Sequence, residues 1–256
     1  MTDDLLRLTV LGCATPYPSV GNPCSGYLVS CGDTRVWVDA GAGTLGELRR
    51  HTSLGDLDAI WISHMHADHT SDLLTAYYGA QYADVKLAAP IPLYGPPGLS
   101  DRLADYLTNS EVRSEIGKAF AVHELHDGHR VEIGPLTLTS GAVTHGMPAF
   151  AARFEAAGRS LVYSGDAAPC DGLTNLASGC DVLLCEAGDN KAPEGLIPFH
   201  HTPEDAGATA ASAGARRLIV THVNHAVPPE QAVARASTRF DGPVECAAPG
   251  ATYSIS

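Results

Sequence analysis

One short run of the sequence, H-x-H-x-D-H at positions 64–69, is rich in side chains that bind metal ions. His64 and His66 are two positions apart, so in an extended segment they point to the same side and can grip one ion. The following turn can aim Asp68 and His69 at a second ion nearby. Imidazole suits Zn²⁺ and Asp adds a harder oxygen ligand, so the mixed set favours zinc, with manganese or iron as substitutes.

Three further candidate ligands follow later β-rich runs. They are His145 in AVTHGMP, Asp166 in LVYSGDA and His222 in LIVTHVNH. A site for two divalent ions needs about this many imidazoles and carboxylates, delivered from the ends of several strands. A single histidine is more often a surface or packing residue. Three histidines and an aspartate within one short run are hard to explain as packing, so the pattern indicates a metal site.

Alternating and continuous apolar runs predict the elements that must position these residues. Strands are expected at Leu6–Leu11, Tyr27–Ser30, Arg35–Asp39, Ala59–Ser63, Pro92–Tyr94, Arg130–Ile133, Leu136–Thr139, Ala149–Phe154, Ser160–Tyr163, Asp181–Cys185 and Arg217–Thr221. Helices are expected at Leu45–His51, Ser71–Tyr82, Leu99–Leu107, Pro203–Ala213 and Pro229–Phe240. Strand meanders interspersed with helices are typical of a mixed α/β chain.

The motifs resemble those of a known superfamily over nearly the whole chain. The H-x-H-x-D-H run, followed by His, Asp and His in that order, is similar to the signature of the metallo-β-lactamase fold. The opening LTVLGCATPYPSVGNPCSGYLV, the turn VWVDAGAG and the late segment HHTPEDAG resemble the ribonuclease Z-like branch. Bacterial cyclic-nucleotide phosphodiesterases share this layout, including the YSGD and DVLLCEA pieces. The resemblance implies an αββα sandwich of two mixed β-sheets flanked by helices, with the ligands gathered at one rim.

The same resemblance implies a ligand set and a reaction. One metal site would use His64, His66 and His145, the other would use Asp68, His69 and His222, and Asp166 would bridge the two. A hydroxide held between the ions would be the nucleophile, and Asp68 would also orient it and take up its proton. Thiolate-using lactamases of the superfamily have a cysteine as the comparable ligand, whereas the phosphodiesterase branch has a carboxylate, as here.

His200 matches the catalytic histidine of the family and is the candidate proton donor to the leaving oxygen, and His201 fills the adjacent variable position. Thr202 can cap a helix whose first residue is Pro203, with Asp205 in the capping-box position. His200 would then be held just before a rigid helix start. The alternatives are a pair of exposed histidines in a loop and a donor role for His201 instead.

Other polar residues have two interpretations each. Asp39 could orient a ligating histidine, or it could end its strand and bond the backbone of the following glycine turn. His123, His126 and His129 surround the turn signal D-G, which favours a hairpin with solvated histidines over a further cluster. His225 could reach the cleft or only its rim.

Composition limits the classes of protein. Residues 1–256 are expected to form a single domain, because no linker, charge block or repeat marks a boundary. The acidic opening MTDDLLRLTV is unlike a signal peptide, and no apolar run approaches the length that spans a membrane. The seven cysteines show no C-x-x-C spacing, which fits reduced thiols and a cytoplasmic location.

Charge bears on the substrate. The net charge of −13 and the scarcity of lysine disfavour nucleic acid, whose affinity depends on phosphate contacts. In ribonuclease Z a tRNA-gripping arm separates the third metal histidine from the bridging aspartate, whereas the interval from His145 to Asp166 has room only for a hairpin. We therefore expect a small phosphodiester substrate, most specifically a cyclic nucleotide such as cAMP. The alternatives are a lactone, thioester or β-lactam hydrolase, a ribonuclease Z-like nuclease, and a non-catalytic metal-dependent binding module. Family likeness also suggests a homodimer.

Overall fold

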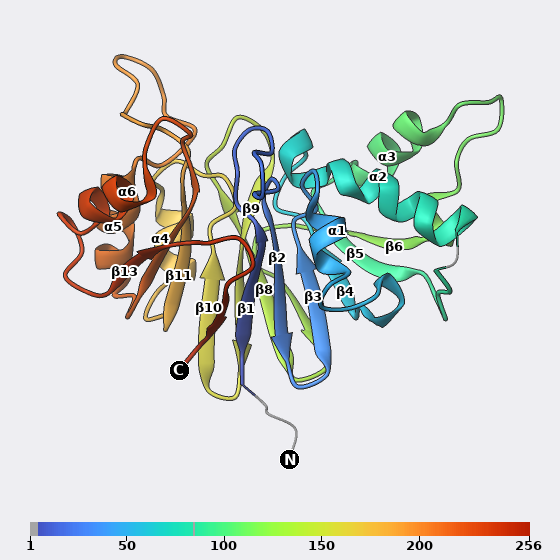
Figure 1. Ribbon diagram of the computed structural model, residues 1–256, viewed down its shortest axis with the longest axis horizontal. Coiled ribbons are helices and arrows are strands. Elements are labelled where there is room, and N and C mark those ends of the chain that lie inside the picture. The colour runs from blue at the N-terminus through green and yellow to red at the C-terminus, as the bar shows by residue number, and fades with distance from the viewer. Residues whose placement is uncertain (1–4, 84) are drawn as a thin grey trace.

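The computed structural model describes residues 5–83 and 85–256, so the opening residues 1–4, part of the segment compared with a signal peptide, lie outside the described residues. Two seven-stranded β-sheets pack face to face, and helices cover the outer face of each sheet (Figure 1). In the view of Figure 1 the helices α1, α2 and α3 lie on the right and α4, α5 and α6 on the left. The predicted αββα sandwich of the α/β class is confirmed.

The strands of the first sheet follow the order β14-β1-β2-β3-β4-β5-β6. Their bounds are β14 Thr252–Ser254, β1 Arg7–Gly12, β2 Gly26–Cys31, β3 Thr34–Val38, β4 Ala59–Trp61, β5 Ile91–Gly95 and β6 Phe120–Glu124. The second sheet has the order β13-β12-β11-β10-β9-β8-β7. Its strands are β13 Val244–Cys246, β12 Leu218–Val223, β11 Val182–Ala187, β10 Arg159–Tyr163, β9 Ala149–Ala156, β8 Leu136–Val143 and β7 His129–Ile133.

The helices mostly connect parallel strands. They are α1 Thr44–Leu48, α2 Ala67–Tyr82, α3 Leu99–Leu107, α4 Asp171–Leu176, α5 Pro203–Ala213 and α6 Pro229–Ala236, with single 3-10 turns at Leu54–Asp56 and Ile116–Lys118. In the first sheet β3 to β6 are parallel, and in the second sheet β10 to β13 are parallel. Parallel neighbours end at the same edge of a sheet, so the loops after them converge. That edge is the upper one in Figure 1.

Three apolar layers hold the sandwich together. Between the sheets, Val29 and Phe154 belong to one cluster of buried side chains. Outside the first sheet, Trp37 packs in a second cluster that includes Leu73 of α2, and α5 contributes Ala206 to a third cluster outside the second sheet. Strands buried on both faces need continuous apolar runs, and this is why β11, VLLCEA, is buried at every position.

The predicted hairpin around the D-G turn at 127–128 is wrong. The strand before it, β6, is the edge of the first sheet, and β7 after it is the edge of the second, so the turn carries the chain from one sheet to the other. The helix predicted from Ser71 begins earlier, at Ala67. The short elements α4, β13 and β14 carry too few residues for periodicity to reveal them.

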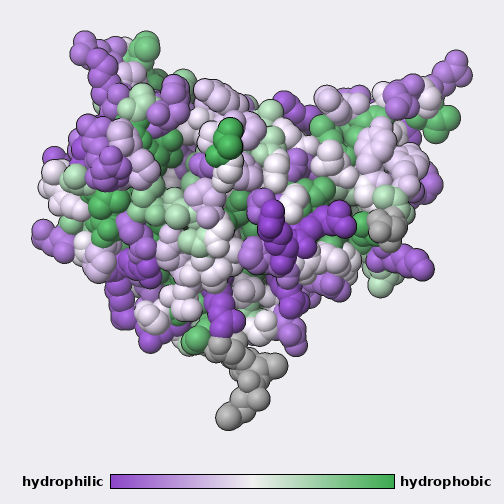
Figure 2. Space-filling model, in the orientation of Figure 1, coloured by the Kyte–Doolittle hydropathy of each residue, from purple (hydrophilic) through white to green (hydrophobic). Residues whose placement is uncertain are grey.

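The surface is mixed in polarity. Figure 2 shows purple, hydrophilic side chains spread across this face, with green confined to separate patches. Its upper outline is hollowed between two projections, which correspond to the loop after β11 and the segment after α3 in Figure 1. Within residues 5–83 and 85–256, no helix is long and apolar enough to cross a membrane. All the cysteines are free thiols, and most are buried.

Candidate functional site

The predicted ligands come from loops and strand ends at the shared edge of the sheets. His64 and His66 lie in the extended segment after β4, and Asp68 and His69 lie in the first turn of α2. His145 follows β8, Asp166 follows β10 and His222 lies near the end of β12. Because these strands belong to both sheets, the packing of the sheets brings residues that are distant in the sequence together.

One cluster contains His64, His66, His145 and Asp166, whose ligand atoms all lie within 4.8 Å of one another. His66 Nδ1 is 2.9 Å from His64 Nε2 and 3.3 Å from His145 Nε2. Burial is the main cause that lowers the pKa of His64 and of His66, and it is helped by neighbouring histidines. Both imidazoles are therefore held in the neutral form that binds a metal ion.

A second cluster contains Asp68, His69 and His222, again with ligand atoms within 4.8 Å of one another. Asp68 Oδ2 lies 3.7 Å from His69 Nε2 and 3.9 Å from His222 Nε2. The two histidines are buried, whereas the Asp68 side chain keeps 10% of its surface exposed. The carboxylate of Asp68 is thus the member of this cluster that is accessible to solvent.

The carboxylate of Asp166 lies between the two clusters. Its Oδ1 is 3.3 Å from His69 Nε2, and its Oδ2 is 3.3 Å from His222 Nε2 and 3.6 Å from His64 Nε2. Burial would raise the pKa of this carboxyl, but His222 and His69 outweigh it and lower the pKa well below its usual value. Asp166 therefore presents a carboxylate to both clusters at once.

The donor atoms fit divalent cations. His69 Nε2 and Asp166 Oδ1 are buried and face each other without a hydrogen-bond partner. Leaving buried polar atoms unsatisfied costs about 1–3 kcal/mol each, and an ion placed between them removes this cost. Imidazole nitrogens with carboxylate oxygens are ligands that zinc takes readily. The clusters are therefore able to hold metal ions.

Asp39 proves to be the orienting partner of a candidate ligand. The side chain is fully buried, and its Oδ2 lies 2.7 Å from His69 Nδ1. Its Oδ1 accepts the backbone N–H of Ser63 at 2.7 Å, and Oδ2 also accepts the Tyr163 hydroxyl at 2.8 Å. Asp39 thus fixes the His69 ring and the start of the H-x-H segment together, whereas the sequence had left its role open.

Hydrogen bonds also orient two of the other histidines. His145 Nδ1 donates to the carbonyl of Phe199 at 2.9 Å, and His222 Nδ1 lies 2.8 Å from the hydroxyl of Ser25. In each case the bonded nitrogen leaves Nε2 to face the cluster, which is the arrangement metal-binding histidines adopt.

We expect Asp39→Asn to weaken zinc binding about 10–100-fold, because partners that orient a ligand by hydrogen bonding typically contribute this much to metal affinity. Competition with a chromogenic chelator measures the affinity. Asp181→Asn is the matched control, since Asp181 is also a buried carboxylate but accepts from Ser160 and pairs with Arg216, away from the clusters. Equal zinc affinity in the wild type and Asp39→Asn would contradict the orienting role.

The structure separates the two adjacent histidines. His200 Nδ1 lies 3.0 Å from Glu186 Oε1 and 3.8 Å from Asp166 Oδ2, and its ring stacks at 6.1 Å on that of His222. His201 is fully buried and uses both ring nitrogens in the fold, one on the Ala167 carbonyl. Only His200 therefore presents its ring to the clusters.

The predicted capping box forms and fixes the backbone of these histidines. The Thr202 hydroxyl accepts from the N–H of Asp205, whose side chain accepts from the N–H of Thr202, and Pro203 is the first residue of α5. The helix start is therefore rigid, and His200 precedes the capping residue Thr202 by two residues.

Glu186 is a site residue that the sequence analysis missed. Its fully buried carboxylate accepts the backbone N–H groups of Ala167, Gly188 and His201, and it contacts His200 Nδ1. Burial would lower the pKa of His200, but the hydrogen bond and charge of Glu186 outweigh it and raise the pKa to about 9. The available signal was a single carboxylate inside the otherwise apolar β11.

The histidines around the sheet crossover stand apart from this site. His123 and His126 are exposed, and His129 is half-buried against the ring of Tyr94. Among the described residues they join no group of side chains able to hold an ion.

Comparison with known proteins identifies relatives along the whole chain. "Uncharacterized protein ML1173" of Mycobacterium leprae is 36% identical over 98% of this chain and 89% of its own length. A ribonuclease Z of Mycobacterium bovis is 29% identical over 94% of this chain and 95% of its own length. The crystal structure of the metallo-β-lactamase fold protein YhfI from Bacillus subtilis superposes with a TM-score of 0.85 at 27% identity, covering 98% of this chain and 100% of YhfI.

The family model described as "Beta-lactamase superfamily domain" matches residues 34–223, a span that contains all the candidate ligands. The sequence motifs, the two-sheet fold and this match agree, and the chain belongs to the beta-lactamase superfamily, in its metallo-β-lactamase fold.

Proposed function

We propose that this protein is a metal-dependent hydrolase that cleaves a small phosphodiester, most specifically a cyclic nucleotide such as cAMP. The observation that carries the proposal is the Asp166 carboxylate within 3.3–3.6 Å of histidines from both clusters, with His200 beside it. Relatives named ribonuclease Z and "Probable metallo-hydrolase YhfI" support hydrolysis on this scaffold. A ribonuclease acts on phosphodiesters, which favours that bond over a lactone or β-lactam.

In this proposal His64, His66 and His145 would hold one divalent ion, Asp68, His69 and His222 would hold the other, and Asp166 would be shared between the two sites. When bound, such ions lower the pKa of water and neutralise charge on a phosphoryl oxygen. Zinc is the metal that the donor set favours, with manganese or iron as substitutes.

Two side chains handle protons. Asp68, the solvent-facing carboxylate of its cluster, orients the attacking water and accepts its proton. His200, held by Glu186, donates a proton to the departing ribose oxygen. The two groups thus act as the base and the acid of one displacement at phosphorus.

Charge and connectivity favour a small substrate over nucleic acid. The chain has 29 acidic and 16 basic residues, so the protein surface offers few phosphate contacts that would favour binding of a polyanion such as RNA. The interval from His145 to Asp166 is occupied by the antiparallel pair β9 and β10, which has the size of a hairpin and no projecting arm.

A substrate panel tests the proposal. Metal-loaded protein is assayed against cAMP, cGMP, bis(p-nitrophenyl) phosphate, a tRNA precursor and acyl-homoserine lactones. We expect turnover of cyclic nucleotides and of bis(p-nitrophenyl) phosphate, abolished by a chelator. Turnover of lactones without cleavage of any phosphodiester would contradict the proposal and indicate a lactone hydrolase. Processing of the tRNA precursor alone would indicate a nuclease.

Metal binding should also stabilise the fold, which distinguishes an enzyme site from a binding module that folds without metal. At free zinc 100-fold above its Kd, the free energy of unfolding should rise by about 2.7 kcal/mol. For a chain of this size that corresponds to roughly 5–10 °C in Tm. Calorimetry of metal-free protein with and without zinc measures the shift, and EDTA should reverse it. An unchanged Tm would count against a multi-ligand metal site.

A further inference from the structure

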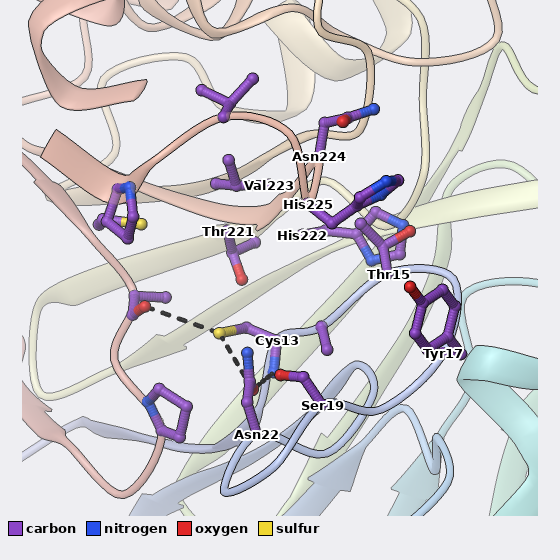
Figure 3. A pocket seen from close by; sticks show the side chains of 16 residues that line it. Cys13, Thr15, Tyr17, Ser19, Asn22, Thr221, His222, Val223, Asn224 and His225 are labelled. Carbon is purple, nitrogen blue, oxygen red and sulfur yellow. Dashed lines mark hydrogen bonds between the residues drawn. The ribbon is translucent and has the colours of Figure 1, made fainter. Parts of the chain in front are cut away.

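A cavity of about 390 Å³ lies directly beside the metal-binding clusters, and we call it the His222 cavity. Its walls come from the segment after β1, at residues 13–22, and from the ends of β12 and β13 with the segments that follow them, at residues 221–229 and 246–249. His222 forms part of this wall, so the cavity and the second cluster share a residue (Figure 3). Pockets for small ligands begin at about 300 Å³, so a nucleoside-sized group fits.

We infer that the His222 cavity receives the nucleobase of the substrate, an inference that rests on the proposed function. The leaving ribose oxygen is placed by His200, whose ring stacks on His222 at 6.1 Å. A ribose that extends past His222 on this side carries its base towards the cavity. The position of His200 next to His222 thus indicates on which side of the phosphate the ribose and base lie.

Two rings stand at the end of the cavity that is nearest the cluster. Tyr17 and His225 have ring centroids 6.4 Å apart, tilted by 45°, and in Figure 3 they lie on the same side as His222 and Thr15. Tyr17 is 61% exposed, which leaves its ring free to turn onto a flat ligand. A purine offers the planar π-face that such rings stack on.

The cavity lining suits a neutral heterocycle. None of the described residues that line it is an aspartate, glutamate, lysine or arginine, although the chain as a whole is strongly acidic. The floor is built from small and apolar side chains such as Ala14, Val223 and Val227, while Thr15 and Ser19 add hydroxyl groups. An uncharged wall does not repel the adjacent phosphate, and the hydroxyls can bond the polar edge of a base.

A second groove borders the other side of the motif and is the competing location. It lies between α2 and α3, has a volume of about 310 Å³, and is lined by Met65, Ala67, Arg102 and Tyr106 among others. It borders the H-x-H segment, whereas the His222 cavity is lined by His222, the residue on which the ring of His200 stacks. Tyr106, which is 74% exposed there, provides a matched control for Tyr17.

The test compares Tyr17→Ala, Tyr17→Phe and Tyr106→Ala with the wild type. Removing a stacking ring should raise KM for cAMP about tenfold at nearly unchanged kcat, with Tyr17→Phe close to the wild type because the ring is kept. Methyl riboside 3′,5′-cyclic phosphate, which lacks a base, should show less than about a twofold change in Tyr17→Ala. Tyr106→Ala should leave both substrates unaffected.

Binding of the product AMP, measured by calorimetry on zinc-loaded protein, is a readout independent of turnover. Tyr17→Ala should raise the Kd of AMP about tenfold. If cAMP is hydrolysed but Tyr17→Ala affects neither KM nor AMP binding, or if Tyr106→Ala produces the effect instead, the base-binding role is overturned and the proposed function stands. If the wild type cleaves no cyclic phosphate, the proposed function fails, and absence of AMP binding would overturn the base-binding role as well.

Discussion

Asp166→Asn is expected to lower kcat/KM for a phosphodiester by at least the roughly 10²–10⁴-fold that one catalytic group supplies. Asparagine keeps the shape of the side chain but removes the charge that faces both clusters. Because Asp166 lies 3.3 Å from His69 and from His222, a neutral amide weakens both ion sites together. The metal content per chain, measured by plasma mass spectrometry after dialysis, should therefore fall below that of the wild type.

The fold itself should tolerate this substitution. Asp166 Oδ1 makes no hydrogen bond within the protein, but Oδ2 lies 3.3 Å from His222 Nε2, so the metal-free variant should fold with a Tm at or below that of the metal-free wild type. Asp181→Asn, the buried aspartate outside the site, should retain both activity and metal. Two tightly bound ions and wild-type turnover in Asp166→Asn would exclude a bridging role for this carboxylate.

His200→Ala is expected to reduce kcat for cAMP by about 10²–10⁴-fold while the bound metal is retained. A ribose alkoxide is a strong base and needs a proton as it departs, and His200 is the ring held by Glu186 next to Asp166. The effect should shrink to less than about tenfold for bis(p-nitrophenyl) phosphate, because p-nitrophenolate leaves without protonation. Steady-state rates on the two substrates measure the difference.

The competing role for His200 is metal ligation, since it also forms a ligand-like group with Asp166 and His222. A ligand would lower the rates on both substrates equally and would reduce the metal content. His123→Ala, an exposed histidine distant from the clusters in sequence, is the control for surface histidine loss. Equal losses on both substrates together with missing zinc would therefore reassign His200 from donor to ligand.

The sequence predicts the ligands that lie close together along the chain better than those that only the packing of the sheets brings together. The H-x-H-x-D-H run is local, so the spacing of His64, His66 and Asp68 is enough to predict that it binds metal. The convergence of His145 and Asp166 with this run depends on how two sheets pack, which spacing does not encode. The family resemblance supplied that information, and the structure brings these residues together.

The wrong hairpin prediction and the missed Glu186 have the same cause, which is that a local pattern does not encode long-range packing. The D-G turn at 127–128 is a correct local signal, but a turn does not state whether the next strand joins the same sheet or the opposite one. The strand β6 lies at an edge and is only partly buried, so its apolar pattern is weak. Glu186 was missed although it lies in the DVLLCEA piece, because its importance comes from the three backbone N–H groups that surround it.

The choice between His200 and His201 was also beyond the sequence. Both residues precede the capped start of α5, and their side chains diverge where the chain bends at His200. One ring consequently enters the fold against Ala167 and Thr209, and the other faces the clusters. For Asp39 the sequence analysis did include the observed role, which is to orient the His69 ring, whereas the backbone N–H that its carboxylate accepts belongs to Ser63 and not to the glycine turn.

Hydrolysis of a cyclic nucleotide is tested most directly by ³¹P NMR of cAMP incubated with zinc-loaded protein in ¹⁸O-enriched water. The cyclic phosphate resonance should be replaced by that of 5′-AMP carrying one ¹⁸O, and a chelator should stop the conversion. Persistence of the cAMP resonance with protein that holds its full complement of metal would contradict the assignment as a cyclic-nucleotide phosphodiesterase.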